Sequence, residues 1–178
     1  RDLHYPLRRQ RQMCIRGSGG PVEQTKWLNA FQRESKVPLM TAMDAEWGVA
    51  MRLDSVMPFP WPMTLGAIKD STLLRKIGKR MGMQEKRLGI HYSFGPTLDI
   101  NTNPKNPIIG NRSYGSSPDR VIRQALAIMK GHQEAGILTS GKHFPGHGDT
   151  SKDSHKTLPT VSFSSKRLKE VEFEPYRR

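Results

Sequence analysis

Short apolar runs alternate with longer helical stretches along most of this chain, and this alternation constrains the fold more than any other feature. The runs are too short to be helices of ordinary length, and Gly, Pro or polar residues bound them. Four βα units can be traced, with strands around "MCIRG", "VPLMTAMDAEWG", "IHYSFGPTLDIN" and "GILTSGKHF". Strands that alternate with helices are typical of a parallel sheet covered by helices. The sequence therefore predicts an α/β fold.

Start and stop signals mark the helices between these strands. Pro21 suits the first turn of one helix, Asp70 can cap a second, and Ser117 followed by Pro118 can open a third. Gly89 and Gly136 fall where the second and third helices should end. A last helix is predicted in "SSKRLKEVEFEPYRR". The residues expected to face inward are Trp27, Leu28 and Phe31 in the first helix, and Leu73, Ile77, Met81 and Leu88 in the second.

Composition limits the class of protein. The chain has 178 residues, which suits one domain, and no apolar run approaches the roughly 18 residues of a membrane span. The first residues do not form a signal-peptide pattern. One cysteine, Cys14, excludes an intramolecular disulfide framework, and a lone thiol is most often a buried apolar group. We therefore expect a protein without a membrane span, in a compartment that the cysteine count leaves open.

The formal net charge of +13 raises the question of a nucleic-acid partner. The basic residues are scattered, however, and the densest group is "RRQRQ" at positions 8 to 12. No zinc-finger spacing, aromatic RNA-binding motif or Walker loop accompanies them. We therefore expect no nucleic acid as a partner and assign the charge to a solvated surface.

Polar and charged residues follow the predicted strands and do not precede them. In barrels and in open α/β sheets alike, the carboxyl ends of strands are where functional sites are built. This places one set of residues on a common rim: Asp44, Asp99, Arg112, Lys142, His143, Asp153 and His155.

The stretch "KHFPGHGDTSKDSH", residues 142 to 155, holds three of the six histidines. His143, His147, His155, Asp149 and Asp153 are competent metal ligands, but their spacing matches no established zinc pattern and the single cysteine removes the thiolate-rich sites. We expect no metal and no other cofactor. The "PGHG" run is expected to form either a tight turn or a mobile one.

Proton transfer is the sharper interpretation of the same stretch. Asp153 and His155 are two residues apart, so in an extended loop their side chains can meet. A carboxylate beside an imidazole fixes its tautomer and suits it to acid or base catalysis near neutral pH. The alternative is a histidine capped by a neighbouring carboxylate without catalytic role. Spacing alone leaves both open.

Three motifs in order resemble glycoside hydrolase family 3, in its β-N-acetylglucosaminidase branch. They are "PLMTAMDAEWGVAMRLD", "GPTLDINTNPKNPIIGNRSYG" and "KHFPGHGDTSKDSH", and the resemblance covers roughly residues 35 to 176. It implies a (β/α) barrel that removes terminal β-linked N-acetylglucosamine with retention of configuration, often from peptidoglycan fragments. It also implies sugar contacts for Asp44, Arg112, Lys142 and His143, and an acid/base role for His155 oriented by Asp153. Asp99 and Asn101 are at least as readily explained by a structural role.

The chain departs from the family pattern in three ways. The nucleophilic aspartate of the family lies well downstream of the "DSH" loop, and none of the 23 residues after His155 belongs to a matching motif. A complete barrel takes about 250 residues, so four units make a partial TIM-type barrel with unpaired strand edges. Residues 1–20 form a basic segment that matches the family poorly. We therefore expect residues 1–178 to be one partial catalytic domain, inactive alone, whose other barrel half comes from the same gene product or a partner chain.

Two functions remain open at this point. One is a β-N-acetylglucosaminidase whose ligand is a saccharide containing N-acetylglucosamine, and the other is a non-catalytic carbohydrate-binding or assembly fragment of such an enzyme. The motifs leave open the linkage, the use of water or phosphate, and a cytoplasmic or cell-envelope location.

Overall fold

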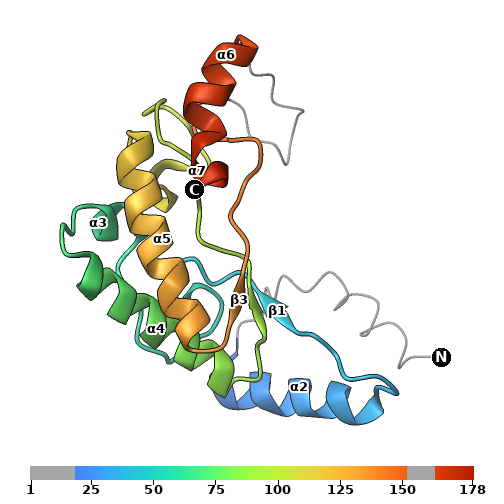
Figure 1. Cartoon of the computed structure of the whole chain (residues 1–178). Coiled ribbons are helices and arrows are strands. Elements are labelled where there is room, and N and C mark those ends of the chain that lie inside the picture. The colour runs from blue at the N-terminus through green and yellow to red at the C-terminus, as the bar shows by residue number, and fades with distance from the viewer. Residues whose placement is uncertain (1–18, 152–162) are drawn as a thin grey trace.

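The computed structural model describes residues 19–151 and 163–178, and it has the parallel α/β architecture expected from the sequence (Figure 1). Three parallel strands, β1 (Ala42–Met43), β2 (Tyr92–Ser93) and β3 (Leu138–Thr139), pair in the order β1-β2-β3. Ala42 and Leu138 both lie opposite Tyr92. Helices α4 (Ser71–Arg87) and α5 (Pro118–Glu134) pack side by side along the sheet. The fold is therefore a part of a TIM-type barrel, as predicted.

The paired strands are shorter than the apolar runs that predicted them. Regular pairing stops after Ser93, because the backbone N–H of Ser140 contacts both Ser93 O and Gly95 O, and Pro96 has no N–H to donate. Pairing resumes at an isolated bridge between Thr97 and Lys142. The interruption lies where the chain turns from the sheet into the residues of the rim.

The helix start and stop signals are confirmed. Helix α2 (Pro21–Glu34) has Pro21 in its first turn, and α4 is capped by Asp70, whose side chain accepts from the N–H groups of Thr72 and Leu73. The side chain of Ser117 caps α5 in the same way. Gly89 and Gly136 follow α4 and α5 with φ angles of +83° and +81°, a conformation that glycine adopts without steric cost.

The inward faces were predicted only in part. Leu28, Met81 and Leu88 are buried, whereas Trp27 and Leu73 are exposed and Leu74 is fully buried in place of Leu73. For Leu73 and Leu74, the cause is the close contact between α4 and α5. Its small residues set the rotation: a Cβ atom at Gly78 would lie 2.3 Å from Ile128 O, and one at Gly131 would lie 2.2 Å from Arg75 O.

Shorter elements complete the described structure. Turns η1 (Val49–Met51) and η2 (Gly110–Arg112) and helix α3 (Pro62–Gly66) lie in the connections between strands and long helices. The predicted last helix is a run of α6 (Ser165–Arg167), the π-helical turn η3 (Leu168–Glu172) and α7 (Glu174–Arg177). Within the described ranges, no helix is long and apolar enough to cross a membrane.

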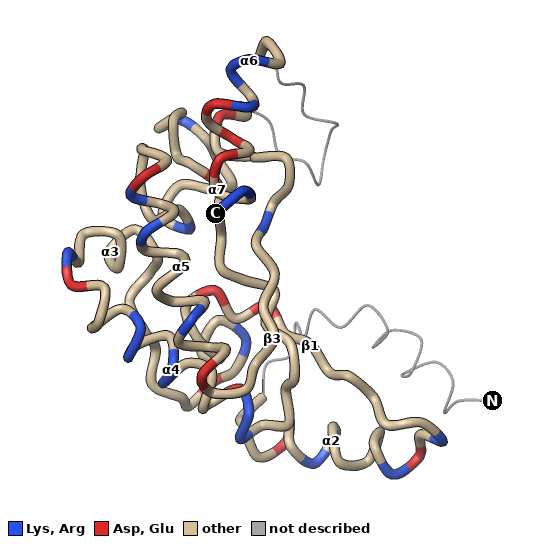
Figure 2. Tube along the Cα trace, viewed as in Figure 1, with Lys and Arg blue, Asp and Glu red and all other residues tan. Residues whose placement is uncertain are grey.

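Several predictions fall outside the described residues. They concern the first strand around residues 13 to 17, Cys14, the basic group at 8 to 12, and the pair Asp153 and His155. Figure 2 shows that Lys and Arg elsewhere are spread over α2, α4, α5 and the last helices and do not gather in one stripe.

Candidate active site

Three charged side chains from the ends of two strands meet in one buried cluster. Asp44 and Glu46 follow β1, and Lys142 follows β3. The ammonium nitrogen of Lys142 lies 2.6 Å from Asp44 Oδ1 and 2.8 Å from Glu46 Oε1. The Glu46 side chain is fully buried, and those of Asp44 and Lys142 are largely so. Parallel pairing of the strands is what brings Lys142 to residues nearly 100 positions earlier.

Arg112 joins this cluster from the turn η2. Its Nε and Nη2 atoms donate to Glu46 Oε2 and Oε1, at 2.9 and 2.6 Å, in the two-pronged geometry that a guanidinium forms with a carboxylate. Its Nη1 atom donates to the carbonyl of Ile108 at 3.3 Å, which ties the side chain back to its own turn. Glu46 is therefore the common anchor of Arg112 and Lys142.

These contacts favour the ionised form of the Glu46 carboxylate. Burial alone would raise the pKa of Glu46, but the hydrogen bond from Arg112 and the charges of Lys142 and Arg112 outweigh it, so its pKa lies below the ordinary value. The hydrogen bond to Glu46 raises the pKa of Arg112 further, against the effect of burial. Both groups are charged at neutral pH.

His143 is held between a carboxylate and the guanidinium. Its Nδ1 atom lies 2.5 Å from Asp99 Oδ2, and its Nε2 atom lies 3.2 Å from Arg112 Nη2. Because Arg112 can only donate, Nε2 accepts and the ring proton sits on Nδ1, where it is donated to Asp99. The peptide bond between Lys142 and His143 is cis, and both side chains enter the same cluster.

Arg52 joins the charged cluster through its contacts with Asp44. Its Nη2 atom lies 3.1 Å from Asp44 Oδ2, and its Nε atom donates to the Asp44 carbonyl at 3.2 Å. Among the described residues, the cations Arg52, Arg112 and Lys142 balance the anions Asp44, Glu46 and Asp99. A cluster rich in donors and acceptors, with formal charges that balance, is suited to the hydroxyl groups of a neutral ligand.

The turn after His143 is fastened to the same region. Asp99 Oδ1 accepts the backbone N–H of His147 at 2.6 Å, and Asn106 Nδ2 donates to the His147 carbonyl at 2.7 Å. Gly148 lies against the backbone of Ile100, where a Cβ atom would be 1.8 Å from the carbonyl oxygen. The "PGHG" run therefore forms a tight turn in this structure.

The candidate metal ligands of this stretch that the structure describes are His143, His147 and Asp149, and each contacts another side chain. His143 binds Asp99, His147 contacts Thr150 through Nδ1, and Asp149 pairs with Arg167 at 3.4 Å. In the part of the chain that the structure describes, no group of three or more His, Cys, Asp or Glu side chains is arranged to hold a metal ion.

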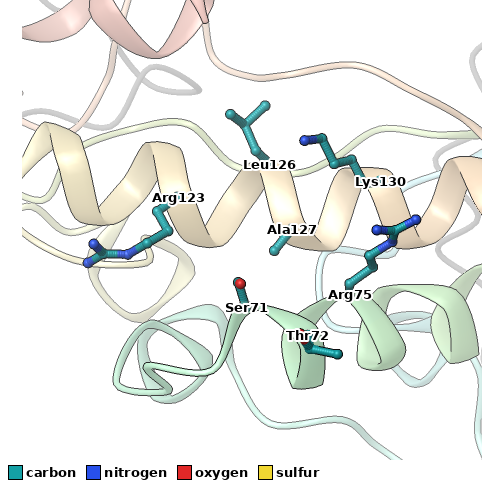
Figure 3. A pocket seen from close by; sticks show the side chains of 7 residues that line it. All are labelled: Ser71, Thr72, Arg75, Arg123, Leu126, Ala127 and Lys130. Atoms are coloured by element: carbon teal, nitrogen blue, oxygen red, sulfur yellow. The ribbon is translucent and has the colours of Figure 1, made fainter.

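A hollow on the outer face is separate from this cluster. It lies between α4 and α5 and is lined by Ser71, Thr72, Arg75, Arg123, Leu126, Ala127 and Lys130 (Figure 3). Arg75 pairs with Glu134 beside it, and the carboxylate of Asp70 already occupies the N-terminal amides of α4. The hollow therefore offers a mixed rather than a purely cationic surface.

The structure brings together Asp44, Arg112, Lys142 and His143, the four expected sugar contacts that it describes. It adds Glu46 and Arg52, which the sequence did not assign to the site, and it joins to them Asp99, which the sequence placed on the same rim. Glu46 had a readable signal, since it lies two residues from Asp44 and shares its face of an extended strand end. Asp99 was left open between a structural role and a sugar contact, and its contacts with His143 and His147 favour the structural role.

The family is established by comparison with known proteins. The family model described as the glycosyl hydrolase family 3 N-terminal domain matches residues 22–178. The chain therefore belongs to glycosyl hydrolase family 3.

Several relatives are named as β-hexosaminidases or β-N-acetylglucosaminidases. Beta-hexosaminidase A of Pseudoalteromonas piscicida is 36% identical over 152 residues, which are 83% of this chain and 25% of the relative. A family 3 β-N-acetylglucosaminidase from Paenibacillus sp. str. FPU-7 superposes with a TM-score of 0.83 and 41% identity, covering 90% of this chain and 31% of that structure.

NagZ from Neisseria gonorrhoeae, solved in complex with N-trifluoroacetyl-D-glucosamine, superposes with a TM-score of 0.80 and 32% identity. The match covers 89% of this chain and 49% of that structure. The chain thus spans between a quarter and half of the length of these relatives.

Proposed function

We propose that this chain forms the sugar-binding and acid/base part of a retaining β-N-acetylglucosaminidase. The observation that carries the proposal is the convergence of Asp44, Arg112, Lys142 and His143, from separate segments, on one neutral polar cluster at the carboxyl ends of the strands. The names of the relatives support N-acetylglucosamine as the sugar.

In this proposal the cluster binds the terminal sugar ring through its hydroxyl groups. Asp44 accepts hydrogen bonds from the sugar. Lys142 and Arg112 donate to the sugar with the N–H groups that are not already bonded to Asp44, Glu46, His143 or Ile108. Because Glu46 and Asp99 hold their partners before the ligand arrives, little ordering is needed on binding.

The proposed chemistry has two steps. A carboxylate oxygen of an aspartate bonds to the anomeric carbon, and the glycosidic oxygen leaves with a proton from His155, oriented by Asp153. Water then attacks the anomeric carbon, His155 takes its proton, and the aspartate is released. Asp153 and His155 lie outside the described residues, and residues 1–178 contain no motif that matches the family's nucleophile. We also propose that the ligand is a saccharide. The other half of the barrel is supplied by further chain or by a partner in this proposal.

Binding is the first test. Calorimetric titration of the full chain with N-acetylglucosamine should give saturable binding, and Lys142→Met should weaken it about tenfold or more, because a charge-assisted hydrogen bond contributes about 1.5 to 3 kcal/mol. Lys130→Met, on the exposed side of α5, is the matched control and should bind normally. No binding by the unsubstituted chain, or equal binding by both variants, would contradict the proposal.

Catalysis is the second test, on a chromogenic N-acetyl-β-glucosaminide. The full-length gene product should turn over, and residues 1–178 alone should not. In the full-length protein, His155→Ala should slow substrates with poor leaving groups more than activated ones. Equal losses would count against an acid role for His155, and binding without any turnover by the full-length product would favour a non-catalytic sugar-binding protein.

A further inference from the structure

Arg167 in helix α6 contacts residues on both sides of the segment that carries Asp153 and His155. Before this segment, the Nη2 atom of Arg167 lies 3.4 Å from Asp149 Oδ2. After the segment, the guanidinium carbon of Arg167 lies 5.0 Å from the centroid of the Phe163 ring, an arrangement in which a cation is attracted to the ring face. A single side chain therefore joins the two ends of the segment.

A third contact fixes Arg167 itself. Its Nη1 atom donates to Glu172 Oε1 at 3.2 Å, and Glu172, in the π-helical turn η3, leaves only 6% of its side chain exposed. Gly146 packs against the same carboxylate residue, since a Cβ atom at Gly146 would lie 2.7 Å from Glu172 Cγ. Arg167 is thus held between two carboxylates, and only 30% of its side chain meets solvent.

The stretch that leads to Asp149 is fastened on two sides. On one side the ring of Phe144 stacks on Phe173, with centroids 5.6 Å apart, and meets the ring of Tyr176 edge-on at 5.3 Å. On the other side the backbone N–H of His147 donates to Asp99, the carboxylate that also holds the histidine of the charged cluster. The position of this stretch relative to the cluster is therefore fixed before the segment begins.

We propose that Arg167 is a positioning residue for proton transfer. By joining Asp149 to Phe163, it holds both ends of the segment that carries Asp153 and His155 in one place relative to the sugar site. Fixing the two ends of a chain segment reduces the conformations open to the residues between them. The inference rests on the proposed function and deepens it, because it names a residue outside the charged cluster on which the acid/base step depends.

The test measures kcat/KM of the full-length gene product on two N-acetyl-β-glucosaminides, one with an activated 4-nitrophenyl leaving group and one with a poorer phenyl leaving group. Arg167→Met keeps a long side chain but removes the charge. It should lower kcat/KM for the phenyl glycoside about tenfold, because departure of phenol needs a well-placed proton from His155, and a misplacement of about 1 Å can cost up to about 100-fold in rate. The 4-nitrophenyl glycoside should be affected much less. Arg167→Lys keeps the charge and should restore part of the loss.

A double substitution separates positioning from a general loss of structure. In a His155→Ala background, Arg167→Met should cause no further loss, because no acid/base group remains to be positioned. Asp149→Asn, a smaller change, should reproduce the pattern of Arg167→Met and gives the same comparison if that variant does not fold. Lys166→Met is the matched control, because Lys166 pairs with Glu170 and leaves 82% of its side chain exposed. It should change neither rate.

The affinity for N-acetylglucosamine, measured by calorimetric titration, should be the same with and without Arg167→Met. A loss of rate that is equal for the two glycosides, that adds in full to the loss in His155→Ala, or that is accompanied by weaker sugar binding would overturn the positioning role alone. No turnover by the unsubstituted full-length product, or turnover that His155→Ala leaves unchanged, would overturn the proposed acid/base function and the positioning role together.

Discussion

Asp99 and His143 are joined by a short contact, with Asp99 Oδ2 2.5 Å from His143 Nδ1, and this contact sets the geometry of one side of the cluster. Asp99 also accepts the backbone N–H of His143 at 3.2 Å and, through Oδ1, that of His147 at 2.6 Å. One buried carboxylate thus orients a ring and holds the first turn of the loop that leads toward Asp153.

Replacing this carboxylate should uncouple the ring from the turn. Asp99→Asn keeps the shape but offers one acceptor oxygen for three donors, so at least one N–H group loses its partner. Affinity for N-acetylglucosamine should fall about tenfold or more. The ¹⁵N shifts of the His143 ring should show loss of the single Nδ1–H tautomer, and Asp119→Asn, on the exposed start of α5, should change neither quantity. An unchanged tautomer with unchanged affinity would show that Asp99 does not position His143.

Removing the charge of Glu46 should cost stability in a pH-dependent way. Glu46→Gln leaves Arg112 and Lys142 without their common anion, and breaking a buried ion pair costs about 3 to 5 kcal/mol. The pKa of Glu46 is lowered in the fold, so its contribution is present above the unfolded-state pKa and is lost as pH falls through the folded-state pKa.

Urea unfolding over a pH series measures this difference. The stability gap between the unsubstituted chain and Glu46→Gln should be full near neutral pH and should shrink in the acid range. Glu23→Gln, at an exposed position of α2, should show little gap at any pH. A gap that widened on acidification would contradict the lowered pKa.

The buried pair of Glu85 and His132 should stabilise the fold more at low pH than at high pH, which is the opposite of the pH dependence expected for Glu46. His132 Nε2 lies 3.4 Å from Glu85 Oε1, and Nδ1 lies 3.0 Å from Ile128 O. Burial lowers the pKa of His132, but Glu85 and the Ile128 carbonyl outweigh it, so the pKa is raised. Its contribution is therefore full below the unfolded-state pKa of about 6.5 and is lost as pH rises through the folded-state pKa.

Proton NMR titration of the His132 ring and urea unfolding of Glu85→Gln measure this effect. The stability lost in Glu85→Gln should be larger at about pH 5.5 than after His132 has lost its proton. In the variant, the pKa of His132 should fall. A His132 pKa below the ordinary histidine value in the unsubstituted chain would contradict the assignment.

Gly148 should tolerate no side chain. In Gly148→Ala the new methyl group would lie 1.8 Å from Ile100 O, so the turn must move away from the strand end that carries Asp99. Overpacking of this kind costs about 1 to 3 kcal/mol, and the sugar affinity should fall with it. Gly19→Ala, which has nothing within 4 Å, should leave the melting temperature and the affinity unchanged. Equal melting temperatures for the two variants would show that the turn is not packed as described.

The sequence predicted the helix ends well, because the residues that start and stop a helix act on backbone groups close to them in the chain. Asp70, Ser117 and Gly136 act through backbone groups one to four residues away, so their roles can be read without the fold. The rotation of α4 could not be read in this way, because Gly78 and Gly131 meet only when α4 and α5 pack together.

The sequence by itself determined the parallel α/β fold, the family motifs and the four sugar-contact candidates Asp44, Arg112, Lys142 and His143. Only the tertiary structure decided how these four are held: Glu46 joins Arg112 to Lys142, and Asp99 fixes His143. The physical reason is distance along the chain. Glu46 and Arg112 are 66 residues apart, and a contact of that kind exists only after parallel strands have brought their carboxyl ends to one edge.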